Sequence, residues 1–163
     1  MNINKPLEHI KDCMLQHCET LAVAESVTSG HLQAAFSLAD QATDFFQGGI
    51  TAYNLGQKAM HLKIDPIHAL TCNCVSQKIA IEMATSACNL FCCDWGIGIT
   101  GYAAPVPKLK INALFAYYAF SRKGENVHAK QIESKKMNIK KVQEHYVSVL
   151  LKDFDHYLWN KTP

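Results

Sequence analysis

The segment Ala22–Gly30 constrains the fold of this chain more than any other. It begins as a short apolar run and then becomes a polar turn, Glu25-Ser26-Val27-Thr28-Ser29-Gly30, which ends in glycine. The segment that follows, from 31 to 38, carries apolar residues at helical spacing. This order predicts a buried strand whose carboxyl end leads directly into a helix.

The polar turn has two interpretations. Serine and threonine in front of a helix are ordinary N-cap residues, because their hydroxyls satisfy unpaired N–H groups. In open α/β sheets, however, ligands bind at the carboxyl ends of strands. There the same turn would offer a carboxylate, hydroxyls and a helix N-terminus to one ligand. The segment by itself favours capping, so the functional interpretation depends on the rest of the chain.

Helices and strands alternate along the rest of the sequence. Helices are predicted at about 5–18, 28–38 and 54–61, from Ser76 to about 91, and over a long C-terminal stretch. Strands are predicted at 20–25, 50–53, 95–100, 113–120 and 127–133. Segments 40–46, 65–73 and 101–110 are predicted to be irregular, although Pro66 suits the first turn of a helix. The short link between the last two strands predicts an antiparallel hairpin. Residues 1–163 therefore form one α/β domain, a three-layer α/β/α sandwich with a mixed, mostly parallel sheet of about five strands.

The charge and cysteine content narrows the function classes. The net charge is only +2, and the densest basic patch, Lys135-Lys136 with Lys140-Lys141, is typical of a solvated helix face, so no nucleic-acid partner is expected. No membrane association is expected either, because the uncharged stretch Gly96–Val106 is too short to span a bilayer. Seven cysteines without a secretory signal or zinc spacing indicate free thiols in the cytoplasm and no metal. The apolar face of the C-terminal helix fits either core packing or a homo-oligomer.

Hydroxyl-rich turns follow each of the first three predicted strands. Ser26 lies in the first turn, Tyr53 begins the second with Lys58 just beyond it, and Thr100 begins the third. If these strands are parallel, the three turns meet at one edge of the sheet. Serine is a weak nucleophile until a base takes its proton, and lysine can be that base only when it is neutral. The ordinary alternatives are an exposed helix lysine, a half-buried strand tyrosine and a turn-capping threonine.

Four segments, taken in order, resemble a known family. Ala24-Glu25-Ser26-Val27-Thr28-Ser29-Gly30 is similar to the Ala-Glu-Ser-Cys-Thr-Gly-Gly signature of the CinA C-terminal domain, the nicotinamide mononucleotide deamidases of the PncC type. Phe46–Asn54, with Lys58, resembles the family's Gly-Gly and Tyr-Ser-Asn-x-x-Lys segment. Val75–Ala84 and Thr100–Pro105 resemble its Val-Ser helix and its Thr-Gly-Ile-Ala-Gly-Pro loop. The resemblance runs from about residue 5 to 160.

The resemblance implies an activity and a site. The family hydrolyses the carboxamide of nicotinamide mononucleotide and releases ammonia, with no metal or cofactor. By resemblance, Ser26 is the nucleophile, Lys58 its general base, and Tyr53 assists proton transfer or orients the substrate. The partner is then a small pyridine nucleotide or a related amide, and the N-terminus of the helix after Thr28 would hold the oxyanion or the substrate phosphate. The substrate-binding residues would be Glu25, Thr28, Ser29, Gly30, Gly48, Gly49, Asn54, Thr100 and Gly101.

Three departures from the family pattern leave two hypotheses open. Ser29 replaces a glycine, the loop Val106–Asn112 is short and has no glycine, and Asn138–Gln143 lacks the arginines of the family's Asp-Arg-x-x-x-Arg motif. The first hypothesis is an active amidohydrolase on nicotinamide mononucleotide or a related amide. The second is a catalytically weak or inactive paralogue that acts as a nucleotide-binding, regulatory or protein-interaction module.

Overall fold

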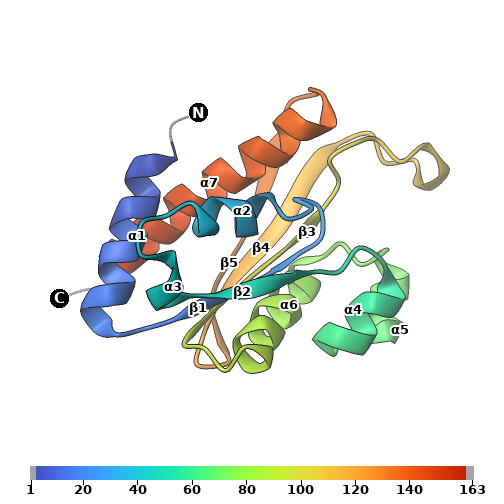
Figure 1. Cartoon of the computed structure of the whole chain (residues 1–163). Helices are drawn as coiled ribbons and strands as arrows, with labels where there is room; N and C mark the ends of the chain where they lie inside the picture. Colours follow the sequence, from blue (N-terminus) through green and yellow to red (C-terminus); the bar gives the residue numbers. More distant parts are fainter. Residues whose placement is uncertain (1–2, 161–163) are drawn as a thin grey trace.

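The computed structural model describes residues 3–160, which are built around a single five-stranded sheet in the order β2-β1-β3-β4-β5 (Figure 1). The strands are β1 Leu21–Glu25, β2 Phe46–Thr51, β3 Trp95–Gly101, β4 Leu114–Arg122 and β5 Glu125–Ser134. Strand β1 pairs in parallel with both β2 and β3. Strands β3, β4 and β5 pair antiparallel to one another in turn. The predicted hairpin and the parallel arrangement of the first three strands are confirmed.

Helices cover both faces of this sheet (Figure 1). One face packs against α1 Asn4–His17, α2 His31–Ser37, α3 Ala42–Phe45 and α7 Ile139–Trp159. The other face packs against α4 Leu55–Leu62, α5 Pro66–Thr71 and α6 Gln77–Leu90, while a short 3₁₀ helix, Pro107–Leu109, lies in the β3–β4 loop. The predicted three-layer α/β/α fold with a mixed sheet is therefore confirmed. No helix among residues 3–160 combines the length and the apolar character needed to cross a membrane.

The larger of the two main cores lies between the sheet and α7. Phe154 of α7 is fully buried and meets the ring of Trp95 edge-on, with 5.4 Å between the ring centroids. Trp95 is only 3% exposed, whereas Trp159, the other tryptophan, is 74% exposed at the end of α7. Tyr146 is buried on the same helix. The apolar face of α7 thus packs into the core.

Glycines on β3 let α6 pack unusually close to the opposite face. A Cβ at Gly96 would lie 2.0 Å from the carbonyl oxygen of Ala84, and one at Gly98 would lie 2.3 Å from that of Ala80. Successive strand residues point to opposite faces, so the large residues of β3 fill one core while its glycines admit the α6 backbone on the other side. This contact holds α6 close against β3, the strand whose carboxyl end carries Thr100.

The structure differs from the sequence predictions in three segments. Residues 65–73 are not irregular but contain α5, because Asp65 accepts hydrogen bonds from the N–H groups of Ile67 and His68. Residues 40–46 likewise contain α3. Strand β2 begins at Phe46, so Gly48 and Gly49 lie within the strand rather than in front of it.

Candidate active site

The turn after β1 is organised by the buried carboxylate of Glu25. It accepts hydrogen bonds from Thr28 Oγ1 at 2.5 Å and from the backbone N–H groups of Gly30 at 3.1 Å, Leu32 at 3.0 Å and Gln33 at 2.8 Å. The expectation that this helix N-terminus binds an oxyanion or a phosphate is therefore wrong, because Glu25 already occupies its donors. The helix starts at residue 31, three residues later than predicted, because Ser29 and Gly30 have positive φ angles that a helix cannot contain.

Backbone contacts fix Ser26 at the sheet edge. Its N–H donates to the carbonyl of Ile99 on β3 at 3.1 Å, and its own carbonyl accepts from the N–H of Ser29 at 3.2 Å. Ser29 and Gly30 both have positive φ angles, 50° and 93°, which turn the chain sharply into α2. Glycine adopts this conformation without strain, whereas serine does so at some cost.

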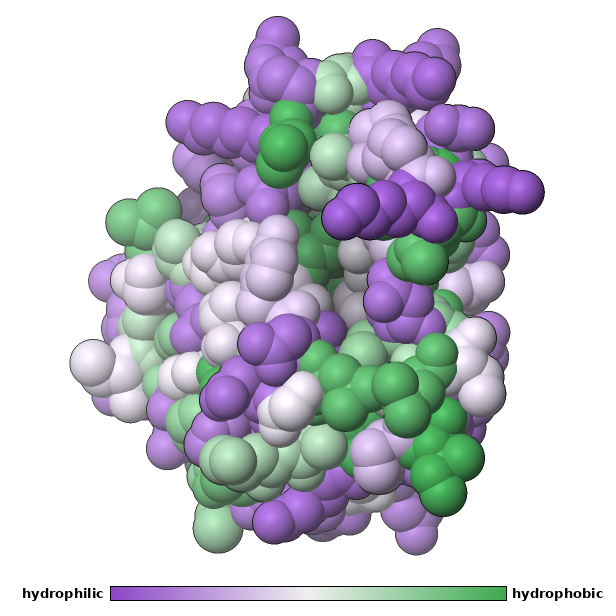
Figure 2. Space-filling view, turned by 90° about the vertical axis from the view of Figure 1, so that its right-hand side faces the viewer, coloured by the Kyte–Doolittle hydropathy of each residue, from purple (hydrophilic) through white to green (hydrophobic). Residues whose placement is uncertain are grey.

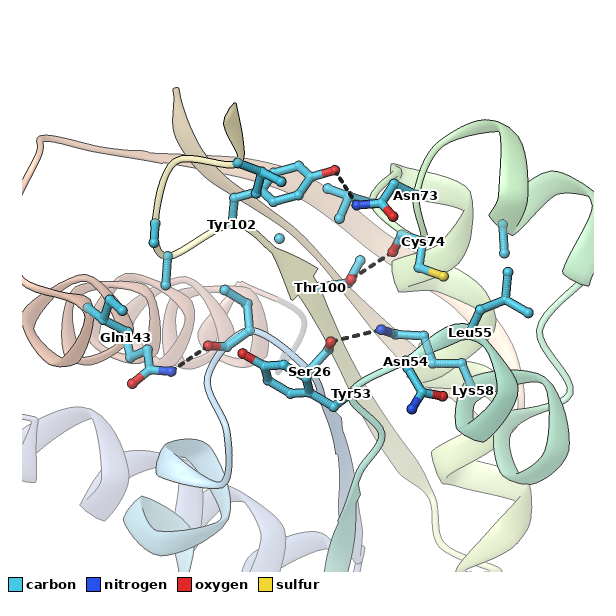
Figure 3. A pocket seen from close by; sticks show the side chains of 18 of the residues that line it. Ser26, Tyr53, Asn54, Leu55, Lys58, Asn73, Cys74, Thr100, Tyr102 and Gln143 are labelled. Carbon is cyan, nitrogen blue, oxygen red and sulfur yellow. Dashed lines mark hydrogen bonds between the residues drawn. The ribbon is translucent and has the colours of Figure 1, made fainter. Parts of the chain in front are cut away.

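Lys58 reaches the hydroxyl of Ser26 from α4. The side chain of Asn54 accepts from the N–H of Gln57 and so begins the helix one turn before Lys58. Lys58 is only 2% exposed, and its Nζ donates to Ser26 Oγ at 2.8 Å (Figure 3). The alternative of an exposed helix lysine is thus wrong. A serine hydroxyl and a lysine amine, 32 residues apart in sequence, form one buried pair.

Burial also controls the protonation of this pair. Removal from water lowers the pKa of Lys58 from its usual value of 10.5, and the charge of a Cys74 thiolate would oppose this effect. The pKa of Cys74 is itself raised by burial, so its thiol stays protonated at neutral pH. The neutral amine that a general base requires is therefore favoured at Lys58.

The wall opposite Lys58 comes from the end of β3 and the segment between α5 and α6. Thr100 Oγ1 donates to the carbonyl of Cys74 at 2.8 Å, and Asn73 Nδ2 donates to the Tyr102 hydroxyl at 3.2 Å (Figure 3). The carbonyl of Tyr102 accepts from Tyr146 Oη at 2.9 Å, which ties this wall to α7. Of these residues, only Thr100 was predicted as a site residue.

Gln143 connects α7 to the turn after β1 that carries Ser26. Its Nε2 donates to the carbonyl of Val27 at 2.8 Å and to Ser29 Oγ at 3.3 Å, and the side chain is buried (Figure 3). The sequence reasoning missed this residue. One feature of the sequence could have indicated it: Gln143 follows Val142 on the apolar face of the last helix, where a buried polar side chain needs a hydrogen-bond partner.

These side chains surround one cavity of about 500 Å³. Figure 2 looks onto this side of the molecule and shows a hollow with an apolar margin over α4 and α5, where Ile67 and Leu70 are exposed. Tyr53, at 72% exposure, lies at the mouth. The predicted residues that line the cavity are Ser26, Tyr53, Asn54, Lys58, Thr100 and Gly101. The predicted residues outside its lining are Glu25, Thr28, Ser29, Gly30, Gly48 and Gly49.

The three predicted glycines outside the lining have backbone or packing roles: Gly30 and Gly48 adopt positive φ angles, and Gly49 permits a close contact. A Cβ at Gly49 would lie 2.5 Å from Val23 Cγ2 and 2.8 Å from Gln33 Cγ, so this glycine lets β2 and α2 pack together. Within residues 3–160, no group of three or more His, Cys, Asp or Glu side chains is placed to hold a metal ion.

Comparison with known proteins places this geometry in a family. The model of the CinA C-terminal domain matches residues 4–158, nearly the whole chain. The chain belongs to the CinA C-terminal domain family. A CinA-like protein from Picosynechococcus is 42% identical over 96 residues, which cover 59% of this chain and 23% of that protein. One from Prochlorococcus marinus is 43% identical over 88 residues, 53% of this chain and 21% of that protein. The CinA domain described here thus spans about a fifth of the length of these curated relatives.

Solved structures share the fold over almost the entire CinA domain. A competence-damaged protein (CinA) superfamily protein from Escherichia coli has 25% identity and a TM-score of 0.87, covering 94% of this chain and 88% of that one. The Klebsiella pneumoniae superfamily protein has 20% identity and a TM-score of 0.90, covering 98% and 99%. This likeness extends the family assignment to the three-dimensional fold.

Proposed function

We propose that this CinA domain is an amidohydrolase that cleaves the carboxamide of nicotinamide mononucleotide or of a related small amide. The observation that carries the proposal is the buried pair of Ser26 Oγ and Lys58 Nζ, 2.8 Å apart, at the wall of a ligand-sized cavity. A serine nucleophile needs an adjacent base, and a desolvated lysine supplies one without a histidine.

In the first half of the reaction, Ser26 Oγ attacks the amide carbon while its proton passes to the neutral amine of Lys58. The carbonyl π bond opens and leaves a tetrahedral intermediate with a negative oxygen. Lys58, now an ammonium, returns the proton to the amide nitrogen, so the C–N bond breaks and ammonia leaves. The product on the protein is an ester between the acyl group and Ser26.

In the second half, water replaces ammonia. Lys58 takes a proton from the water as its oxygen attacks the ester carbon, and it then returns a proton to Ser26 Oγ as that oxygen leaves. The carboxylic acid departs and both side chains regain their starting states. Tyr53, which lines the mouth of the cavity, would orient the substrate or assist proton transfer.

The developing oxyanion needs hydrogen-bond donors near Ser26. Val27 directly follows Ser26 and lines the cavity. Within residues 3–160, the backbone N–H groups of Val27 and Thr28 make no hydrogen bond to the protein, whereas those of the α2 N-terminus are taken by Glu25. We assign the oxyanion to the Val27 N–H, which Gln143 supports by holding the carbonyl of the same residue.

The test is ammonia release from a panel of pyridine amides that includes nicotinamide mononucleotide. Ser26→Ala and Lys58→Ala are expected to lower the rate by about 10³-fold or more, because each removes one half of the nucleophile–base pair. The matched control is Lys78→Ala, which removes an exposed lysine that pairs with Asp65 and Glu82 away from the cavity. Release that survives in Ser26→Ala, or no release from any amide by the wild-type chain, would contradict the proposal and favour a non-catalytic binding module.

A further inference from the structure

The wall of the cavity carries almost no charge. Among the described residues that line it, Lys58 is the only one with a basic or acidic side chain, and Lys58 is already paired with Ser26. The remaining polar groups are amides and hydroxyls, together with the Cys74 thiol. Burial keeps that thiol protonated and disfavours the ammonium form of Lys58, so both groups carry less charge than they would in water.

Several groups that commonly bind a phosphate are already paired within the protein or lie outside the lining. The N–H groups at the start of α2 donate to Glu25, whose buried carboxylate would also repel an anion. The first two turns of α7 contribute Ile139 and Gln143 to the lining, and the Gln143 Nε2 already donates to Val27 and Ser29. The lysines of the β3–β4 loop are exposed and lie outside the lining.

The charge of a ligand therefore decides whether it fits this cavity, whereas its size does not. A cavity of about 500 Å³ accepts either a nucleotide or a smaller amide. A phosphate that enters it loses its hydration and meets no cationic side chain other than Lys58, whose ammonium form burial disfavours, so its entry is unfavourable. An uncharged body meets no such cost, and it gains contact with the apolar side chains of Leu70 and Ile139 around the mouth.

We infer that the substrate of this CinA domain is an uncharged primary amide with an aromatic or apolar body and no phosphate group, and that the side chains of Ile139 and Gln143 set this preference. The inference rests on the proposed amidohydrolase function and narrows its substrate class. Phosphate-bearing pyridine nucleotides are then poor substrates of this chain.

The first experiment compares Ser26-dependent ammonia release from nicotinamide and benzamide with that from nicotinamide mononucleotide. We expect kcat/KM to be at least about tenfold higher for the uncharged amides, the loss that one missing charge-assisted hydrogen bond causes. Equal or faster hydrolysis of the nucleotide would overturn the inference and leave the proposed function standing. If no amide is hydrolysed, the proposed function fails, and calorimetric binding to the wild-type chain decides the inference. Tighter binding of nicotinamide than of the nucleotide supports it, and any other result overturns it.

The second experiment places a cation where the lining has none. Ile139→Arg is expected to raise the ratio of kcat/KM for nicotinamide mononucleotide to that for nicotinamide by about tenfold, because arginine pairs well with phosphate. The matched control is Leu38→Arg, which adds the same charge at an exposed position outside the lining and should leave this ratio unchanged. An unchanged ratio in Ile139→Arg contradicts the inference. A loss of nucleotide turnover in the double variant Lys108→Ala/Lys110→Ala also contradicts it, because the loop lysines would then be binding the phosphate.

Discussion

At the scale of single residues, the proposed reaction depends on the protonation state of Lys58. Burial disfavours the ammonium form, and Lys58 Nζ lies 2.8 Å from Ser26 Oγ. The fraction of neutral amine rises as the pH approaches and passes the lowered pKa. The same burial makes the folded state bind this proton less tightly than the unfolded chain does. Between the lowered pKa and 10.5, the contribution of Lys58 to folding stability therefore becomes more favourable as the pH rises.

This residue gives a prediction for the pH dependence of catalysis. The value of kcat/KM should rise with pH and level off, with a midpoint well below 10.5, the usual pKa of lysine. Lys58→Arg should lower kcat/KM by about 10²–10⁴-fold, because the guanidinium keeps its proton at every accessible pH. The measurement is a pH–rate profile of ammonia release with an uncharged amide. A rate that does not change between pH 6 and 10 would show that Lys58 is not the base.

The sequence could predict that Ser26 and Lys58 lie close together, because each belongs to a short motif next to one of two parallel strands. It could not predict Gln143, because the hydrogen bond to Val27 joins residues 116 positions apart and depends on how α7 crosses the sheet. The prediction for Glu25 was wrong for a different reason. Its position in the motif indicated ligand binding, but the carboxylate is turned back onto the N-terminus of its own following helix.

At the scale of elements, the contact between α6 and β3 depends on the absence of side chains. Gly98→Ala should destabilise the protein by about 1–3 kcal/mol, since the new methyl group would overlap the backbone of α6. Gly56→Ala is the matched control, because a Cβ there meets no atom nearer than 3.5 Å and alanine favours a helix. Urea unfolding of the two variants measures the difference. Equal stability of both would mean that α6 can move away from the sheet at little cost.

Long periodic segments were predictable at this scale and short ones were not. The apolar spacing of α7 and the buried run of β3 identify those elements from sequence. Helices α3 and α5 have only four and six residues, too few for a periodic pattern to appear. The start of β2 was misplaced because glycines usually interrupt strands, whereas Gly49 is needed inside this one for close packing.

At the scale of the whole molecule, the cavity is assembled from both helical layers. Helix α4 brings Lys58 from one face of the sheet, and α7 brings Gln143 from the other, so that they meet at the end of β1. Neither layer forms the site alone. Correct geometry at Ser26 therefore depends on the docking of α7 as well as on the local turn.

Gln143→Leu tests this dependence. We expect a loss of stability of about 1–3 kcal/mol, because the carbonyl of Val27 loses a buried donor. We also expect kcat to fall more than KM rises, since the turn that carries Ser26 is misplaced while most of the cavity remains. The matched control is Gln131→Leu, at an exposed position of β5. A change confined to KM would instead make Gln143 a substrate contact with no influence on the turn.

The contrasting burial of the two tryptophans gives the molecule a built-in pair of optical reporters. Trp95 lies in the core against Phe154, so its emission shifts to longer wavelength only when the sheet and α7 separate. Trp159 is in contact with solvent in the native state, so iodide quenches it selectively without perturbing the fold. Fluorescence alone can therefore distinguish fraying at the end of α7 from loss of the core, without any added label.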